Sequence, residues 1–420
     1  MKKTNAAVTL VVAAVLGTAG AAWAVPEVSN VTMAQRANSR IVDIGYTLAS
    51  EEAIITLGIE TNGVPLPDSA VTRLSGDVST VVQPDGAHSI VWNAGTDWPE
   101  HSVTNAKARV TAWVTNSPPQ YCVVDLTGGP NTNAYPVSYY TSVDALPYGG
   151  ITNTVYKSTY LAMRRISAGS FTMGESTKAV AVSLTHDFYA GVFEVTQGQW
   201  YKVMSTSPAN FNEVASQAFR PVEKVSYNDI RGTSALGGGG WPTNDSVYAS
   251  SFIGLLQTKA GIAGFDLPTE AQWEYACRAG TATYYSDEQL GTPANITSNA
   301  QMDVLGRYQY DGGKIDGTVN PAVGCASSNG TAIAGTYLPN KWGLYDVHGN
   351  VYEWCLDWSE DTLSGGSDPS GPSSSSDSYR VFRGGSWNLN ASYSRSAYRN
   401  NYLPTFQASH FGFRLVRTLP

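Results

Sequence analysis

Charge is scarce in this 420-residue chain, because Asp, Glu, Lys and Arg together make up only 14% of it. The formal net charge is −8, and no run of basic residues occurs. A nucleic-acid surface needs clustered Lys and Arg, so the composition argues against a nucleic-acid partner.

Metal motifs are scarce as well. The four cysteines form no CxxC pair, and the five histidines form no HxH or HxxxH spacing, so no familiar zinc or iron site is indicated.

Long hydrophobic runs are also missing after the first 24 residues, so we expect no transmembrane segment. The beginning of the chain instead has the parts of a signal peptide. Met1-Lys2-Lys3 is basic, the stretch to about Leu16 is apolar, and Ala22-Trp23-Ala24 is a small-residue cleavage site. A membrane anchor is the alternative, but the apolar run is short and contains glycine. We therefore expect cleavage near Ala24 and an exported chain that is periplasmic, on the cell surface or secreted.

Residues 25–118 show the period-two pattern of half-buried strands. Val42, Ile44, Tyr46 and Leu48 alternate with smaller or polar residues, and Ala108 begins a similar run. Turn residues separate these runs, which predicts a small immunoglobulin-like β-sandwich. It carries no catalytic constellation, and we interpret it as a spacer or adhesion module. Residues 119–158 are rich in Pro, Gly, Asn, Thr and Tyr, and predict a linker with a leading strand.

Helix signals begin beyond this linker. Thr196 with Gln199, and Thr269 with Gln272, have the spacing of capping boxes, so each pair predicts a helix start. A further helix is predicted over residues 246–259. Residues 361–378 form a Ser/Gly/Pro-rich loop.

Six motifs follow one another in residues 159–420. They are Ser167-Ala-Gly-Ser-Phe-Thr-Met-Gly, Phe193-Glu-Val-Thr-Gln, Leu267-Pro-Thr-Glu-Ala-Gln-Trp-Glu-Tyr-Ala, Gly343-Leu-Tyr-Asp-Val-His-Gly-Asn-Val-Tyr-Glu-Trp, Arg383-Gly-Gly-Ser-Trp and Gly412-Phe-Arg-Leu. This order resembles the formylglycine-generating enzyme / sulfatase-modifying factor family. The resemblance implies an irregular α+β, C-type-lectin-like fold behind the all-β sandwich domain. It does not imply one activity, because fold and function separate readily.

The founding activity of the family oxidises a substrate cysteine to formylglycine with copper held by two cysteines. The resemblance places those two positions at Leu389 and Ser394, and neither side chain is the soft thiolate that Cu(I) prefers. We therefore expect no copper and assign no catalytic residue. A formylglycine-generating or related metal-dependent oxidoreductase with rearranged ligands is the alternative.

The carboxy-terminal segment has the composition of a contact surface between two scaffold-like ends. Gly384-Gly385, Ser386 and Trp387 precede it, and Phe413, Leu415 and Val416 follow it. Tyr supplies contact area at low entropy cost, and Ser and Asn supply adaptable hydrogen bonds. The predicted ligand-binding residues are Asn388, Asn390, Ser392, Tyr393, Ser394, Tyr398, Asn400, Tyr402, Phe406 and His410.

These residues lie where another branch of the family, the variable proteins of diversity-generating retroelements, concentrates its variation. Resemblance to that branch implies display of a surface that binds a protein, peptide or glycan. Ordinary loop composition in an inactive family member is the alternative. Tyr393, Tyr398 and Tyr402 are the expected anchors. Arg395 and Arg399 are expected either to meet a carboxylate or to pair internally.

The resemblance also implies a calcium site in the Gly343 motif. Its ligands would be the Asp346 side chain and the carbonyls of Val347, Gly349 and Val351, with Glu353 as a possible second carboxylate. The alternative is that Asp346 only closes the turn. His348, in the same turn, is expected to be structural.

Two of the four cysteines bracket the predicted calcium loop. We expect a disulfide between Cys325 and Cys355, which export would permit. We expect Cys277 to be a buried small hydrophobe.

Overall fold

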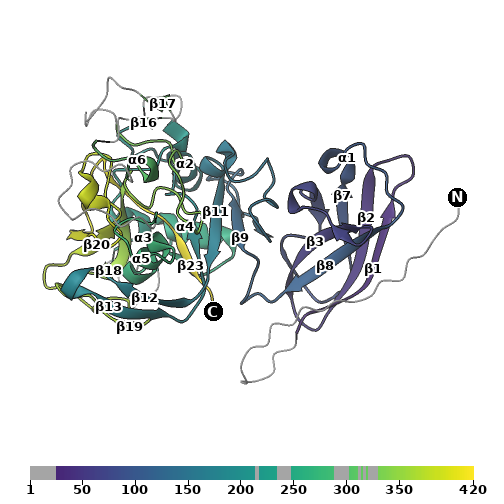
Figure 1. Cartoon of the computed structure of the whole chain (residues 1–420), viewed down its shortest axis with the longest axis horizontal. Helices are drawn as coiled ribbons and strands as arrows, with labels where there is room; N and C mark the ends of the chain where they lie inside the picture. Colours follow the sequence, from purple (N-terminus) through teal and green to yellow (C-terminus); the bar gives the residue numbers. More distant parts are fainter. Residues whose placement is uncertain are drawn as a thin grey trace. The chain divides into compact units, whose positions relative to one another are not determined.

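The computed structural model describes residues 25–212, 217–233, 247–287, 302–310, 314–315, 318–319 and 330–420. It divides into two compact units (Figure 1). The first comprises the chain up to Cys122 together with Val137–Asn153, and the second comprises Val123–Pro136 and Thr154–Pro420. The predicted signal peptide, residues 1–24, lies outside the described residues. In the part of the chain that is described, no helix is both long and apolar enough to cross a bilayer.

The first unit is a sandwich of antiparallel strands, as predicted. One sheet has the order β1-β2-β7-β5, and the other has the order β4-β3-β6 with β8 also paired to β3. The strands are β1 Glu27–Gln35, β2 Ile41–Ala49, β3 Ala53–Thr61, β4 Val64–Pro65, β5 Leu74–Gly76, β6 Val81–Val82, β7 Gly86–Asn93 and β8 Ala106–Trp113, followed at some distance by β10 Val137–Tyr140. The short helix α1, Ala94–Asp97, follows β7.

The core of the sandwich follows from the alternation in its sequence. Val42, Ile44, Tyr46 and Leu48 of β2 are all buried, and the residues between them are partly exposed. Successive side chains on a strand point to opposite faces, so the apolar set faces inward and joins Trp92 of β7.

Residues 137–153 are tied to this unit by hydrogen bonds. The Tyr139 amide donates to the carbonyl of Ser79 over 2.7 Å. The hydroxyls of Thr141 and Ser142 donate to the Asp68 carboxylate over 3.1 and 2.6 Å. Part of the segment predicted as a linker is therefore built into the first unit.

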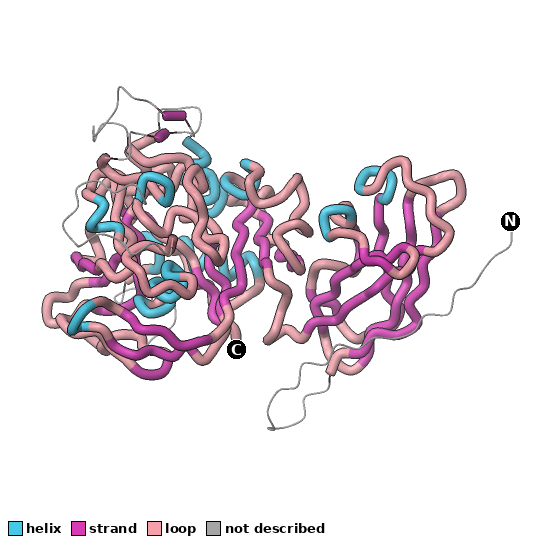
Figure 2. Tube along the Cα trace, viewed as in Figure 1, coloured by secondary structure: helices cyan, strands magenta, loops and turns pink. Residues whose placement is uncertain are grey.

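The second unit is mostly loop, with short strands and helices (Figure 2). Its strand orders are β9-β11-β14-β23-β15, β12-β13-β19, β16-β17 and β21-β20-β18-β22. The strands are β9 Tyr121–Asp125, β11 Tyr160–Ile166, β12 Gly169–Met173, β13 Val180–Leu184, β14 Phe188–Gly191, β15 Phe265–Asp266, β16 Lys314–Ile315, β17 Thr318–Val319, β18 Tyr352–Trp358, β19 Gly366–Ser367, β20 Arg380–Arg383, β21 Arg399–Tyr402, β22 Phe411–Gly412 and β23 Val416–Thr418. The α+β prediction is therefore confirmed.

The helices of this unit are α2 Gln197–Met204, α3 Tyr227–Arg231, α4 Phe252–Ala260, α5 Glu270–Arg278 and α6 Met302–Leu305. Two of them, α2 and α5, begin where the capping boxes predict. Thr196 with Gln199, and Thr269 with Gln272, form complete capping boxes, which satisfy backbone donors that the helix leaves unpaired. The helix predicted over 246–259 starts later, at Phe252, because the Ser251 hydroxyl accepts from the Gly254 amide and caps it there.

Candidate ligand-binding surface

The predicted surface is built on the sheet β21-β20-β18-β22. Strand β21 lies at the edge of this sheet and pairs with β20, with Tyr402 opposite Arg380 and Asn400 opposite Phe382. Asn400 and Tyr402 are two residues apart on a strand, so their side chains point to the same face, and both are exposed. The sheet thus holds the centre of the predicted surface in an ordered position.

A continuous series of ring contacts supports this face, and we call it the aromatic ladder. The ring of Tyr379 lies parallel to that of Tyr402, with centroids 6.0 Å apart and planes at 5°. Tyr402 contacts Phe406 at 4.2 Å, and Phe406 contacts Phe411 at 5.2 Å. The ladder consists of Tyr379, Tyr402, Phe406, Phe411, Phe382 and Tyr352.

The sequence did not predict four members of the ladder: Tyr352, Tyr379, Phe382 and Phe411. Tyr352, Phe382 and Phe411 come from β18, β20 and β22, and Tyr379 precedes β20. Strand pairing brings them into the ladder, where Tyr352, Phe382 and Phe411 are buried. No local pattern marked them, apart from the position of Tyr352 inside the Gly343 motif.

A hydrogen bond connects the ladder to a neighbouring tyrosine. The hydroxyls of Tyr352 and Tyr398 are hydrogen-bonded, and burial raises the pKa of Tyr352. The ring of Tyr393 packs edge-on against Tyr398 at 5.0 Å, and the Asn400 amide reaches the Tyr398 hydroxyl at 3.4 Å. Tyr393 and Tyr398 are therefore half-buried and locked in place, while Tyr402 is 43% exposed.

Both arginines of the segment point inward. Arg395 pairs with Glu175 and donates from Nε to the Ser392 carbonyl over 2.9 Å. Arg399 donates to both carboxylate oxygens of Glu270, from Nε over 2.7 Å and from Nη2 over 2.8 Å. Both arginines therefore pair internally, which is one of the two roles expected from the sequence.

The remaining predicted residues differ in accessibility. Asn388, Asn390, Ser392, Phe406 and His410 are half-buried, and burial lowers the pKa of His410. Ser394 is the exception, because it is fully buried. Its carbonyl contacts His348 Nδ1 at 2.8 Å, which places it in the interior, so it has no access to a ligand at the surface.

The copper positions of the family offer no sulfur in this fold. Ser394 is interior, and Leu389 lies in the loop before it. Among the described residues, Cys277 lies beside this region: its thiol contacts the Ser396 side chain, and its sulfur is 3.9 Å from His348 Nε2. Burial raises the pKa of Cys277 to about 12 and lowers that of His348 to about 4, so at neutral pH the pair is a thiol and a neutral imidazole. A copper thiolate centre or a Cys–His nucleophile does not fit these residues.

The predicted calcium loop lies immediately before β18. Asp346 is 1% exposed, its Oδ2 accepts from the Gly335 amide over 2.6 Å, and its Oδ1 is buried without a hydrogen-bond partner. Burial raises the pKa of Asp346 to about 6. In the described residues no group of three or more His, Cys, Asp or Glu side chains is arranged to hold a metal ion, so calcium would depend on carbonyl oxygens of this loop.

Glu353, the possible second carboxylate, bonds to other protein groups in the structure. It pairs with Arg414, with Nη2 to Oε1 at 2.8 Å, and accepts from Trp273 Nε1 over 2.7 Å. The carbonyl of Val347 accepts weakly from Cys277 at 3.6 Å. The orphaned oxygen of Asp346 is the one feature of the loop that fits a cation.

The cysteine predictions have different outcomes. Cys277 is a buried free thiol, as expected. Cys355 is also free and buried in the structure, which does not support its bridge to Cys325. Cys325 lies outside the described residues, so the pairing stays a prediction.

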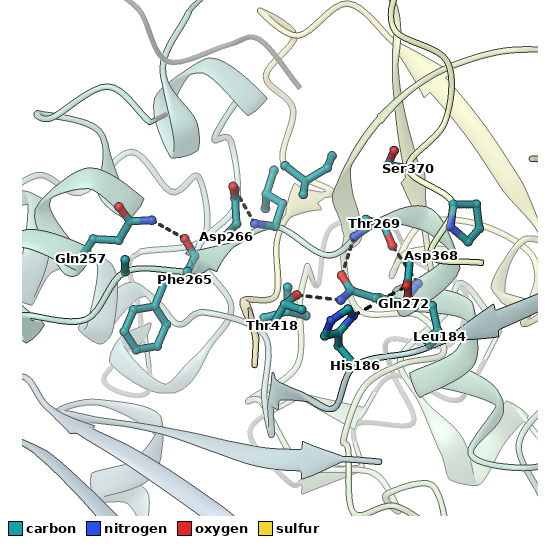
Figure 3. A pocket seen from close by; sticks show the side chains of 16 residues that line it. Leu184, His186, Gln257, Phe265, Asp266, Thr269, Gln272, Asp368, Ser370 and Thr418 are labelled. Atoms are coloured by element: carbon teal, nitrogen blue, oxygen red, sulfur yellow. Dashed lines mark hydrogen bonds and ion pairs between the residues drawn. The ribbon is translucent and has the colours of Figure 1, made fainter. Parts of the chain in front are cut away.

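A cavity of about 620 Å³ lies elsewhere in the second unit (Figure 3). Several of its polar side chains already bond to protein groups. Gln272 bonds to Thr418 and Thr269, and Gln257 donates to the Phe265 carbonyl. Such groups have less capacity left to orient a ligand, so the aromatic surface is the stronger candidate.

Comparison with known proteins assigns the second unit to a family. Residues 152–419 match the Sulfatase-modifying factor enzyme 1-like domain, and the chain therefore belongs to that family. A formylglycine-generating enzyme of Streptomyces coelicolor is 36% identical over 160 residues, which cover 36% of this chain and 46% of the enzyme. The chain thus spans less than half the length of that relative.

Two other similar proteins are matched over most of their own length. The protein named chaperone protein LppX of Paenibacillus barcinonensis is 25% identical over 269 residues, covering 60% of this chain and 88% of the relative. Among solved structures, variable protein 1 of Treponema denticola is 27% identical with a TM-score of 0.48, covering 63% of this chain and 96% of that chain.

Proposed function

We propose that the family domain is a ligand-binding module and that the surface of residues 388–410 makes the contact. The observation that supports this proposal is the arrangement of Tyr402 and Asn400. Both are exposed on the paired edge strand β21, and the aromatic ladder packs against Tyr402. Rigid aromatic anchors surrounded by adaptable polar groups are typical of binding surfaces, because little entropy is lost on contact.

The residues argue against copper oxidation as the main activity. Leu389 and Ser394 carry no thiolate, and Cys277 is held as a buried thiol. The assay is incubation of the mature protein with copper and a cysteine-containing sulfatase-type peptide, followed by the mass of the peptide. We expect the thiol mass to persist. Turnover, lost when copper is removed, would overturn the binding module as the primary function in favour of the oxidoreductase alternative.

Diversified display is a finer form of the same proposal. It is supported by the location of the exposed Asn400 and Tyr402 between the buried ends at Trp387 and Phe413, where a change of side chain removes no buried contact of those ends. A near-repeat of the coding 3′ end beside a reverse transcriptase gene is the expected genomic finding. Its absence would remove display but not binding.

We propose export as part of this function. The residues that support it are the basic start, apolar stretch and Ala22-Trp23-Ala24 site. Amino-terminal sequencing of the protein from its native host should begin near Val25, whereas retention of Met1 would contradict the proposal.

We also propose that Ca²⁺ binds at Asp346 with carbonyls of Val347, Gly349 and Val351. The orphaned, buried Oδ1 of Asp346 supports this, because a buried carboxylate oxygen without a partner is destabilising unless a cation or donor meets it. Chelation with EGTA is expected to lower the melting temperature of the wild type. The variant Asp346→Asn should lose most of this response, and metal analysis of dialysed protein should find about one Ca²⁺ per chain. An unchanged melting temperature with no bound calcium would contradict the site.

A further inference from the structure

We infer that the ligand of this surface is a neutral oligosaccharide that stacks on Tyr402 and bonds to Asn400. The inference rests on the proposed binding function and adds the chemical class of the ligand.

The first step is charge. Residues 388–410, all of which the structure describes, contain only two charged side chains, Arg395 and Arg399. Both are paired inward, with Glu175 and Glu270. Burial lowers the pKa of His410, so this imidazole is neutral at pH 7. The segment itself therefore presents no free charge to a ligand.

Lys224 and Asp229, which hydrogen-bond to this segment from outside it, have opposite signs. The exposed Lys224 lies beside it, with its amide donating to the carbonyls of Ala408 and Phe411. The Asp229 carboxylate accepts from Gln407 Nε2 over 2.6 Å. An acidic or basic partner would gain little from this pair of opposite charges.

The second step is shape and polarity. Tyr402 is 43% exposed, and the parallel ring of Tyr379 and the ring of Phe406 pack against its ring. A sugar ring has an apolar face of C–H groups that packs on an aromatic ring, and a rim of hydroxyls that need donors and acceptors. Asn400 is exposed on the same strand face. Its Nδ2 donates to the Tyr398 hydroxyl over 3.4 Å and its Oδ1 accepts from the Asn401 amide over 2.8 Å, so one N–H and one lone pair of the amide are left for a ligand.

The third step is order. Tyr402 and Asn400 belong to β21, whose backbone is fixed by pairing with β20 from Arg380 to Arg383. Fixing the ring and the amide before binding reduces the entropy cost of contact, which matters most for a ligand with many weak contacts.

The experiment uses the mature full-length protein and an array of neutral oligosaccharides, with polygalacturonate and heparin as acidic probes. Bound glycans are then titrated by calorimetry at about 0.05 and 0.5 M NaCl, which brackets strong and weak screening. We expect binding to a neutral glycan with equal affinity at the two salt concentrations. Tyr402→Ala should weaken it about tenfold or more, and Tyr402→Phe should retain it, because the ring face makes the contact.

The matched control is Tyr201→Ala, since Tyr201 is 51% exposed on α2, outside the surface. It should leave affinity unchanged, and a melting curve checks that each variant is folded. The inference is overturned if no neutral glycan binds, if only acidic glycans bind and release in salt, or if Tyr402→Ala has no effect.

The outcomes separate this inference from the function on which it rests. Binding of an uncharged peptide or a protein that is lost in Tyr402→Ala would overturn the glycan class and leave the binding module intact. Copper-dependent turnover of the sulfatase-type peptide would instead remove the proposed function itself.

Discussion

Asp357, on β18, is a buried carboxyl group whose pKa the fold raises above neutral pH. Burial raises the pKa of Asp357 to about 8, and the neighbouring Glu270 carboxylate adds to the rise, while Arg399 and Arg380 oppose it. Its Oδ2 also accepts from the Glu270 amide over 2.8 Å. At neutral pH the folded state therefore keeps a proton that the unfolded chain releases.

The pH dependence follows from that difference. Between the unfolded pKa, about 3.8, and the folded value of about 8, the native state binds more protons, so stability falls as pH rises. We expect Asp357→Asn to remove a slope of at most about 1.4 kcal/mol per pH unit in urea unfolding from pH 5 to 8.

The exposed Asp361 provides the control, and Asp361→Asn should keep the wild-type slope. Equal slopes for the wild type and Asp357→Asn would contradict a buried, protonated Asp357.

At the scale of elements, Arg414 joins loops and strands that are distant in sequence. Its guanidinium pairs with Glu353 of β18 and donates to the carbonyls of Gly191, Val192 and Tyr345. Both side chains are buried, so removing one charge leaves the other unpaired in the interior.

We expect Arg414→Met to lower the free energy of unfolding by about 3–5 kcal/mol. Adding Glu353→Gln should recover part of the loss, because the uncompensated carboxylate is then gone. Urea unfolding followed by tryptophan fluorescence measures both variants. A double variant less stable than Arg414→Met would show that the ion pair is not the source of the loss.

At the scale of the whole molecule, the two units do not divide at one point in the sequence. Residues 137–153 bond to Ser79 and Asp68 of the first unit, although residues 123–136 belong to the second. We expect a fragment of residues 25–153 to melt at a higher temperature than one of residues 25–118, measured by circular dichroism. Equal melting temperatures would show that these hydrogen bonds add nothing to the sandwich.

Much of the architecture was predictable because its signals are local. The alternation of Val42, Ile44, Tyr46 and Leu48 predicted a strand, and the capping boxes at Thr196 and Thr269 predicted helix starts. Each signal depends on neighbours two to four residues apart, which geometry brings together in any context. The ordered motifs likewise predicted the family that the profile match confirms.

The sequence by itself determined the absence of thiolates at Leu389 and Ser394 and the polar, tyrosine-rich composition after Trp387. Only the tertiary structure decided which of those side chains reach the surface. Ser394 is interior, Arg395 and Arg399 face Glu175 and Glu270, and Tyr402 gains its support from Tyr379. The reason is physical: accessibility and charge pairing depend on partners far away in the chain, and strand pairing alone brings those partners together.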